Sequence, residues 1–226
     1  MPDRGQRKLT DDTAPVTDSD SWTLTDARWL QVTFEAARDS VLAALPCEVT
    51  RTVPCYARLF VVEAGGSPAG PVQLAALLAG GRYMLQPRNI VARGVVDGER
   101  DAVAAAFGPA FGPGSVTLSR DGARVTAAID GDVTVELPSL RAIDRTMLRW
   151  DPWIGVAGIE GEPRMFECAL EPVIDRAFLT KSATLASSGE RGSVWQQFRC
   201  LNMVSACYAE GTLVFGKRQA CAPAAE

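Results

Sequence analysis

The sequence has no histidine among its 226 residues. Histidine is the commonest general base and metal ligand, so its absence excludes Ser-His and Cys-His nucleophile pairs and zinc sites that depend on imidazole. Lysine is also scarce, because only Lys8, Lys181 and Lys217 are lysines among the 23 basic residues. Any catalysis must therefore use carboxylates, arginine, a rare lysine, tyrosine, cysteine, water or the shape of a pocket.

Long apolar segments and an excess of basic charge are missing too. The chain has no run of about 18 apolar residues, and none follows the N-terminal charges, so we expect neither a transmembrane helix nor a signal peptide. The net charge is -4 and the pI is about 5.1, whereas nucleic acids attract basic surfaces. Six cysteines without a C-x-x-C pair are typical of reduced thiols. These features predict a cytoplasmic protein that binds no metal, nucleic acid or membrane.

Hydrophobic residues make up 47% of the chain, enough for the core of one large domain. Their alternation predicts strands at 22–34, 49–63 and 72–78, with a helix at 35–45 that ends at Pro46. Asp121-Gly122 is a strong hairpin signal between strands at 115–118 and 124–129, and a third strand is expected at 133–137.

The second half of the chain is expected to contain more strands and one further helix. Residues 138–150 form either a polar-faced helix or an irregular crossover, and strands are expected at 164–170, 174–185 and 212–215. Residues 201–209 are predicted to be a short helix. The expected organisation is a disordered tail at 1–20, one α+β, mainly antiparallel domain at 21–218, and a C-terminal tail at 219–226.

One stretch, residues 80–114, is punctuated by glycine and proline in apolar surroundings. It is either a connection between strands or the wall of a ligand pocket. In the second interpretation Tyr83, Gln86, Arg88 and Asn89 supply the polar groups that orient a ligand. The alternatives are a surface ion pair for Arg88 and a core ring with a satisfied hydroxyl for Tyr83.

The order and spacing of short motifs over about residues 24–218 resembles the acetoacetate decarboxylase superfamily. The residues that carry the resemblance are Leu45-Pro46, Phe60-Val61-Val62-Glu63, Asp97-Gly98-Glu99-Arg100-Asp101, the Asp121-Gly122 hairpin, Gly161-Glu162-Pro163-Arg164 and the closing segment GTLVFGKR at 211–218. The resemblance implies an acetoacetate decarboxylase-like closed barrel or two packed sheets with a few short helices. It also implies a homo-oligomer, a dimer or larger.

The sequence departs from the family where the family's catalysis takes place. Family decarboxylases carry a Gly-Phe-Pro-Lys-Lys motif whose lysine forms a Schiff base with the keto acid. The corresponding residues here, 104–111, contain no lysine, so a Schiff base cannot form at that position. Phe107 and Phe111 instead make this wall apolar, which suits a bulky hydrophobic ligand better than a small keto acid.

Three functions follow from these observations. The first is a cofactor-independent enzyme of secondary metabolism, of lyase, isomerase or cyclase type, acting on a polyketide-like substrate. The second is a β-keto acid decarboxylase or aldolase that uses Lys181, and the third is a non-catalytic small-molecule-binding protein. The candidate catalytic residues are Arg88, Tyr83, Lys181 and Glu167, and the candidate substrate-binding residues are Gln86, Asn89, Phe107 and Phe111. Lys181 and Glu167 have a simpler interpretation as solvated, outward-facing side chains.

Overall fold

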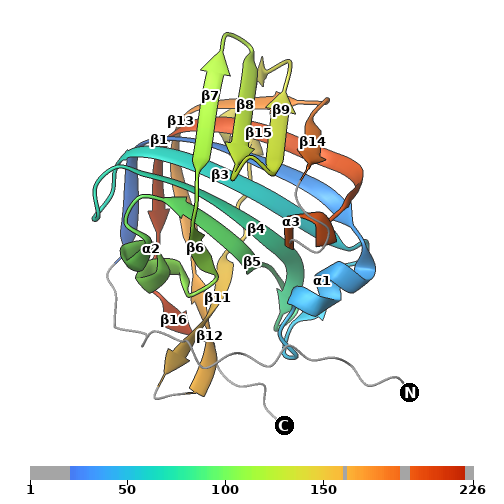
Figure 1. Ribbon diagram of the computed structural model, residues 1–226, viewed down its shortest axis with the longest axis vertical. Helices are drawn as coiled ribbons and strands as arrows, with labels where there is room; N and C mark the ends of the chain where they lie inside the picture. Colours follow the sequence, from blue (N-terminus) through green and yellow to red (C-terminus); the bar gives the residue numbers. More distant parts are fainter. Residues whose placement is uncertain (1–20, 160–161, 189–193, 222–226) are drawn as a thin grey trace.

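The computed structural model describes residues 21–159, 162–188 and 194–221, and these form two β-sheets with a few short helices (Figure 1). The large sheet has twelve strands in the order β10-β13-β15-β1-β3-β4-β5-β11-β12-β16, with β2 paired to β4 and β6 paired to β5. The small sheet has four strands in the order β14-β9-β8-β7.

The strands of the large sheet are β1 (Trp22–Ala36), β2 (Thr50–Arg51), β3 (Tyr56–Gly66), β4 (Val72–Tyr83), β5 (Gln86–Asp97), β6 (Phe111–Pro113), β10 (Arg141–Ala142), β11 (Trp153–Ile159), β12 (Glu162–Cys168), β13 (Leu170–Thr180), β15 (Cys200–Phe215) and β16 (Gln219–Ala220). Those of the small sheet are β7 (Val116–Asp121), β8 (Arg124–Ile129), β9 (Val133–Leu137) and β14 (Thr184–Ser187). The helices are α1 (Arg38–Ala44), α2 (Arg100–Phe107), α3 (Val194–Gln197) and the 3-10 helix η1 (Arg145–Met147).

The large sheet is strongly curved but does not close on itself. Its strand order ends at β10 on one side and β16 on the other, and these two strands do not pair within the described residues. The expectation of a closed barrel is therefore wrong, and its alternative, two packed sheets, is confirmed. Pairing is antiparallel except where β5 lies parallel to β11 and to β6.

Both faces of the large sheet are buried, which explains why β3 and β4 are apolar at successive positions rather than at alternate ones. On β3, Leu59 and Val61 face the small sheet, whereas Phe60 and Val62 face the opposite side. We call the first hydrophobic layer the inter-sheet core and the second the outer core. The outer core is covered by α2, β6 and the start of β11 (Figure 1).

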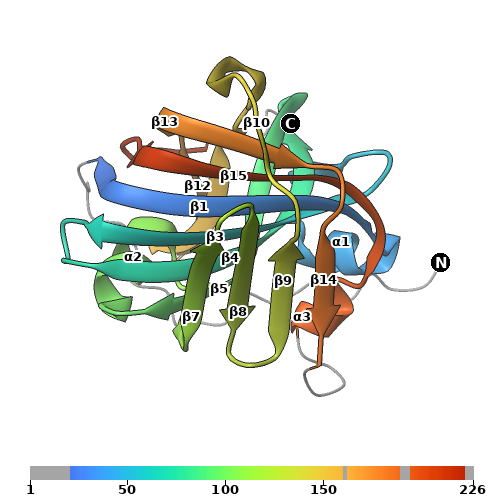
Figure 2. The same ribbon diagram turned by 90° about the horizontal axis from the view of Figure 1, so that it is seen from above.

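The small sheet lies across the large sheet with its strands at a steep angle to β1, β3, β13 and β15 (Figure 2). Arg120 of β7 fixes this arrangement, because its Nη1 lies 2.6 Å from Glu210 Oε1 on β15. The guanidinium also lies over the ring of Phe178, 4.4 Å from the ring centroid. Tyr208 donates a hydrogen bond of 3.0 Å to the same Glu210 oxygen. A charged clamp thus joins the two sheets beside the inter-sheet core.

Several local predictions are confirmed, including the strand at 72–78 and the hairpins of β7, β8 and β9. The helix predicted at 201–209 is wrong, because these residues belong to β15, a strand of 16 residues that pairs with β1 and β13. Residues 138–150 form an irregular crossover that holds β10 and η1. The tail predicted at 219–226 begins with β16, which pairs with β12; residues 222–226 and the tail predicted at 1–20 lie outside the described residues.

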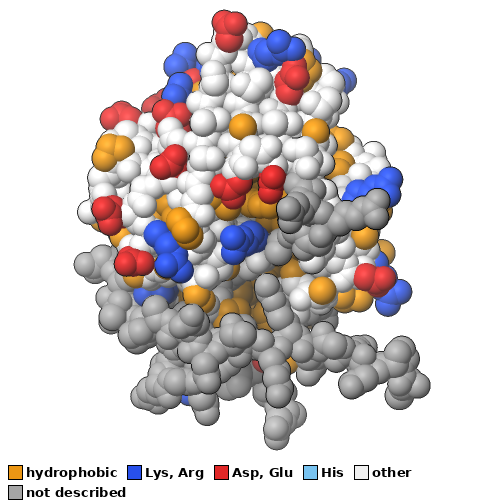
Figure 3. All heavy atoms as spheres, in the orientation of Figure 1, with side chains coloured by type: hydrophobic (Ala, Val, Ile, Leu, Met, Phe, Trp, Pro, Cys, Tyr) orange, Lys and Arg blue, Asp and Glu red, His pale blue; other side chains and the backbone are white. Residues whose placement is uncertain are grey.

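The face seen in Figure 3 carries acidic and basic side chains interspersed, with hydrophobic atoms showing near its centre. Within the described ranges, no helix is long and apolar enough to cross a membrane. The same residues contain no group of three or more cysteine, aspartate or glutamate side chains placed to hold a metal ion.

Candidate functional site

The hairpin of β4 and β5 carries most of the polar residues predicted to orient a ligand. Its two turn residues, Met84 and Leu85, have φ angles of 47° and 66°, and the tight turn leaves Gln86 exposed. Tyr83 is buried against the inter-sheet core, and burial raises the pKa of its phenol above the ordinary value. Gln86 and Tyr83 therefore lie in different environments, one in solvent and one in the core.

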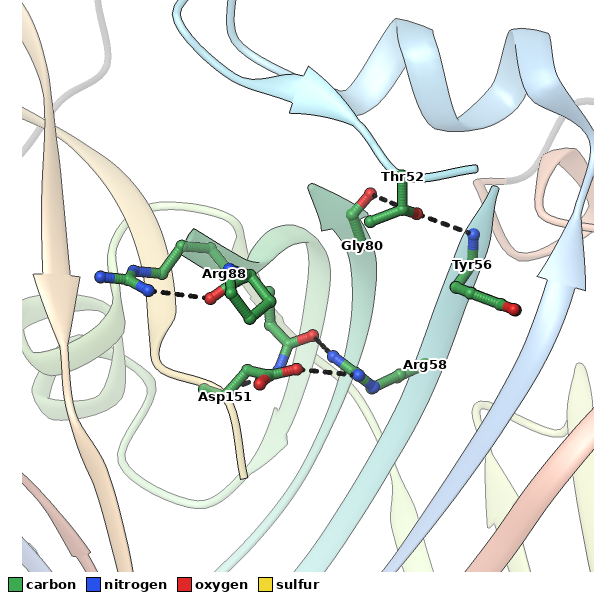
Figure 4. Close-up of polar contacts among 8 residues, drawn as sticks. Thr52, Tyr56, Arg58, Gly80, Arg88 and Asp151 are labelled. Atoms are coloured by element: carbon green, nitrogen blue, oxygen red, sulfur yellow. Dashed lines mark hydrogen bonds and ion pairs between the residues drawn. The ribbon is translucent and has the colours of Figure 1, made fainter. Parts of the chain in front are cut away.

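Asn89 belongs to a polar cluster near the start of β5, whose other members, Arg58 and Asp151, are labelled in Figure 4. Its side chain is 2% exposed and accepts a hydrogen bond from Nη1 of Arg58, while its amide nitrogen donates to the carbonyl oxygen of Asp151 at 3.2 Å. Arg58 Nη2 also lies 2.9 Å from the Asp151 carboxylate. These contacts join β3 and β5 to the segment that enters β11, so Asn89 has an evident role in the fold.

Arg88 and Glu167, two candidate catalytic residues, form an ion pair with each other. Arg88 Nε lies 2.7 Å from Glu167 Oε2, and Arg88 Nη1 donates to the Pro87 carbonyl at 2.9 Å. The side chains are 17% and 27% exposed. The pair bridges β5 and β12, which are separated in the sheet by β11. This geometry matches the ion-pair alternative for Arg88, and the catalytic role of both residues stays a prediction.

Phe107 and Phe111 lie in the outer core, at the end of α2 and the start of β6. The Phe107 ring packs at centroid distances of 4.5 Å from Phe215, 5.0 Å from Trp22 and 5.8 Å from Phe111. Phe111 lies directly over Gly94 of β5, where a Cβ atom would be 2.2 Å from its ring. The segment at 104–111 is thus packed into an aromatic layer, with both rings fully buried.

Lys181 lies just beyond the end of β13 and its side chain is exposed. Lys217, the other lysine that the structure describes, is exposed as well. A lysine that forms Schiff bases is normally activated by an apolar pocket or by a neighbouring cation inside it. Neither described lysine has an apolar enclosure of this kind.

A cavity of about 420 Å³ lies between the two sheets, on the face of the large sheet opposite to the aromatic outer core. Its floor comes from β1, β3 and β4, and its other walls come from β9, β14, α3 and the start of β15. The lining residues are Phe34, Leu59, Leu77, Val133, Leu185, Ser187, Trp195, Gln196, Phe198, Arg199 and Cys200. The Ser40 hydroxyl donates a hydrogen bond to the Gln197 carbonyl and so ties α3 to α1.

The floor of this cavity is apolar, whereas the side of α3 combines the apolar Trp195 and Phe198 with the polar Gln196 and Arg199. Arg199 is the one charged residue among the described residues of the lining, and Ser187 and Gln196 add neutral hydrogen-bonding groups. Burial raises the pKa of the Cys200 thiol, which therefore stays protonated at neutral pH. The cavity can accordingly hold an apolar molecule and donate hydrogen bonds to an oxygen atom on it.

None of the residues singled out in the sequence lines this cavity. The residues that do come from segments far apart in the chain, from Phe34 to Cys200, and only the packing of the small sheet brings them together. The local signal available was the run VWQQFRC at 194–200, which places an indole, two amides and a guanidinium among apolar residues.

No family model matches the chain, and no curated protein matches it in sequence. Solved structures do match. An acetoacetate decarboxylase from Legionella pneumophila superposes with a TM-score of 0.78 at 11% identity, over 92% of this chain and 90% of that one. The enduracididine biosynthesis enzyme MppR, complexed with pyruvate, superposes with a TM-score of 0.72 at 12% identity, over 92% of this chain and 93% of that one. An acetoacetate decarboxylase-like enzyme from Sphingomonas wittichii RW1 superposes with a TM-score of 0.71 at 15% identity, over 96% of this chain and 98% of that one.

The chain has the acetoacetate decarboxylase fold. At identities of 11–15% the likeness concerns the fold and leaves the reaction open. It places the lysine-free segment 104–111 in a scaffold on which the matched proteins are enzymes. In this acetoacetate decarboxylase-like chain the segment is solidly packed, and the cavity lies on the other face of the sheet.

Proposed function

We propose that this protein is a cofactor-independent enzyme on an acetoacetate decarboxylase-like scaffold, acting on a bulky, mainly apolar, polyketide-like substrate. It guides cyclisation, isomerisation, hydration or dehydration without a Schiff base. The observation that carries the proposal is the cavity between the sheets, combined with a segment 104–111 that has no lysine and no room beside it. Cytoplasmic location and a homo-oligomeric state remain predictions.

The size and lining of the cavity support this substrate class. Pockets for drug-sized molecules enclose roughly 300–1,000 Å³ and are mostly apolar, with a few polar groups that fix orientation. The cavity of about 420 Å³, with Phe34, Leu59 and Leu77 as its floor, falls in this range. A flexible chain confined there adopts fewer conformations, and correct orientation alone can supply up to about 7–11 kcal/mol of a barrier.

The chemistry can proceed with the groups present. Ring closure by carbon–carbon bond formation between two parts of one keto chain moves a proton from carbon to oxygen and consumes no co-reactant. Water can carry the proton, and the Arg199 guanidinium can donate hydrogen bonds to the oxygen on which negative charge develops. Arginine keeps its charge at all accessible pH values, so the rate should be flat from about pH 5.5 to 8.5.

Two other functions differ from this one in measurable ways. A β-keto acid decarboxylase or aldolase would use Lys181, whose exposed position lacks the apolar enclosure that activates such lysines. A non-catalytic binding protein would use the same cavity without accelerating any reaction.

The test uses a linear triketo acid as the probe and follows its ring-closed products by chromatography, with and without protein. Leu185→Trp fills the cavity from β14, and Leu85→Trp is the matched control because Leu85 is 85% exposed at a hairpin tip. Ser187→Trp, at the polar rim, is the second filling variant if Leu185→Trp loses stability. We expect acceleration or an altered product ratio with the wild type and Leu85→Trp, and background behaviour with the filling variants.

The outcomes separate the three functions. Binding of the probe without acceleration indicates the non-catalytic protein. Borohydride treatment in the presence of a β-keto acid, followed by an adduct mapped to Lys181, indicates the relocated lysine. Acceleration that persists in both filling variants contradicts the assignment of the reaction to this cavity.

A further inference from the structure

Arg199 has an exposed side chain that lines the cavity, and no ion pair joins it to a carboxylate among the described residues. Six arginines form ion pairs with carboxylates in the described part of the chain: Arg28, Arg58, Arg88, Arg120, Arg124 and Arg176. The cavity that Arg199 lines has an apolar floor, and among the described residues no carboxylate lines it beside Arg199. A guanidinium in this position attracts an anion from the ligand itself.

We propose that the cavity selects amphiphilic carboxylates, with Arg199 as the residue that anchors the carboxylate. This inference rests on the proposed function, because it assumes that the cavity is the ligand site. It goes further in assigning a charge to the substrate and a specificity role to one residue. The substrate class is an apolar ring system or chain that ends in a free carboxylate.

The distribution of polar groups around the cavity fixes the orientation of such a ligand. Phe34, Leu59 and Leu77 form the floor on the large sheet, so the apolar body lies against them. Arg199 and Gln196 come from the segment of α3, and the carboxylate therefore lies on that side. The planar guanidinium presents parallel N–H donors that match the two oxygens of a carboxylate.

The neutral groups of the lining are compatible with an anion. Burial raises the pKa of the Cys200 thiol, so this neighbour of Arg199 adds no negative charge at neutral pH. The Ser187 hydroxyl can donate a hydrogen bond to an oxygen from the side of β14. A cation, in contrast, would meet the positive charge of Arg199 and no carboxylate among the described residues of the lining.

The test compares 1-naphthaleneacetate with 1-naphthaleneacetamide, which share the same apolar ring and differ in charge. Isothermal titration calorimetry at pH 7.5 measures the affinity of each probe for the wild type, Arg199→Gln and Arg82→Gln. Arg82 is the matched control because its side chain is exposed on β4 and outside the cavity. Arg199→Lys keeps the charge but loses the planar fork, and it should retain an intermediate preference.

We expect the wild type and Arg82→Gln to bind the acetate at least about tenfold more tightly than the amide, as one charge-assisted hydrogen bond predicts. Arg199→Gln should bind both probes equally, at the affinity the wild type shows for the amide. Raising the salt concentration from about 0.05 to 0.5 M should weaken binding of the acetate only.

The outcomes that overturn the inference are distinct from those that overturn the proposed function. Equal affinities in the wild type, or a preference that survives Arg199→Gln, contradict the role of Arg199. If both probes bind equally and Leu185→Trp abolishes this binding, the cavity remains the ligand site while the inference fails. If neither probe binds, or if binding persists in Leu185→Trp and Ser187→Trp, the cavity is not the ligand site and both proposals fail.

Discussion

The ion pair between Arg88 and Glu167 decides between two interpretations of the residues that the sequence singles out. If Arg88 orients a ligand, Arg88→Ala lowers activity or affinity without much change in stability. If the pair stabilises the fold, the loss appears in stability alone. The structure favours the second outcome, because the Arg88 guanidinium bridges β5 and β12 and lies outside the cavity.

The size of the effect follows from the geometry of the pair. A hydrogen bond to a charged group contributes about 1.5–3 kcal/mol when well buried, and exposed pairs contribute about 0.2–1 kcal/mol. With side chains 17% and 27% exposed and a separation of 2.7 Å, the pair belongs between these limits, at about 1–2 kcal/mol. For a chain of 226 residues this corresponds to a decrease in Tm of about 2–8 °C.

The assay is urea unfolding of the wild type, Arg88→Gln, Glu167→Gln and the double variant, together with probe binding for each protein. A double-mutant cycle then isolates the coupling between the two side chains. Arg82→Ala is the control and should change the free energy of unfolding by less than about 0.5 kcal/mol, because Arg82 is exposed. The reasoning is refuted if the Arg88 variant keeps its stability and loses ligand binding or turnover.

Three further predictions concern the two cores. Glu210→Gln should lower the free energy of unfolding by about 2–4 kcal/mol, since Glu210 is 13% exposed and pairs with both Arg120 and Arg176. A loss below about 0.5 kcal/mol in urea unfolding would contradict the claim that this charged clamp stabilises the packing of the two sheets. Gly94→Ala should destabilise the protein by about 1–3 kcal/mol, because its Cβ would lie 2.2 Å from the Phe111 ring. Gly65→Ala is the control and should be nearly neutral, because the nearest atom to its Cβ is 3.3 Å away. Equal effects of the two substitutions would argue against tight packing between Gly94 and Phe111. Burial raises the pKa of Cys207 from 9.0 to about 12, so its contribution to stability is complete below pH 9 and is lost as the pH rises toward 12. Between pH 8 and pH 10.5 Cys207 should account for about 2 kcal/mol of the stability that the wild type loses, so Cys207→Ala should lose about 2 kcal/mol less over this range. The rest of the loss comes from other buried groups whose pKa values are raised, among them Cys168, Cys221 and Tyr208, and it should be the same in both proteins.

Much of the fold was predictable because its signals are local. Asp121-Gly122 and Asp130-Gly131 supply the turn residues that hairpins require, and the apolar runs of β3 and β4 indicate strands buried on both faces. The strand order of the large sheet was not predictable in this way. It depends on β1 pairing with β15, a partner near the other end of the chain.

The prediction of a helix at 201–209 failed for a physical reason. Short apolar segments without clear periodicity fit a helix or a strand equally well, and the choice is then made by tertiary pairing. Here Ala206 to Ala209 pair with β1 on one side and β13 on the other, which extends the strand through the whole segment.

The candidate site was less predictable than the fold. The lack of a lysine in 104–111 excludes Schiff-base chemistry there, but a sequence cannot tell whether Phe107 and Phe111 line a pocket or fill it. Arg88 and Glu167 are 79 positions apart, so their pairing was equally invisible. Arg199 borders the cavity only because α3 and the small sheet enclose a space against β1, β3 and β4.

The most direct measurement of the central claim is a crystal structure of the protein with bound 1-naphthaleneacetate. The account predicts electron density for the ring against Phe34, Leu59 and Leu77, with the carboxylate within hydrogen-bonding distance of the Arg199 guanidinium. Density beside Phe107 and Phe111 in the outer core, or next to Arg88 and Glu167, would contradict the assignment of the ligand site to the cavity between the sheets.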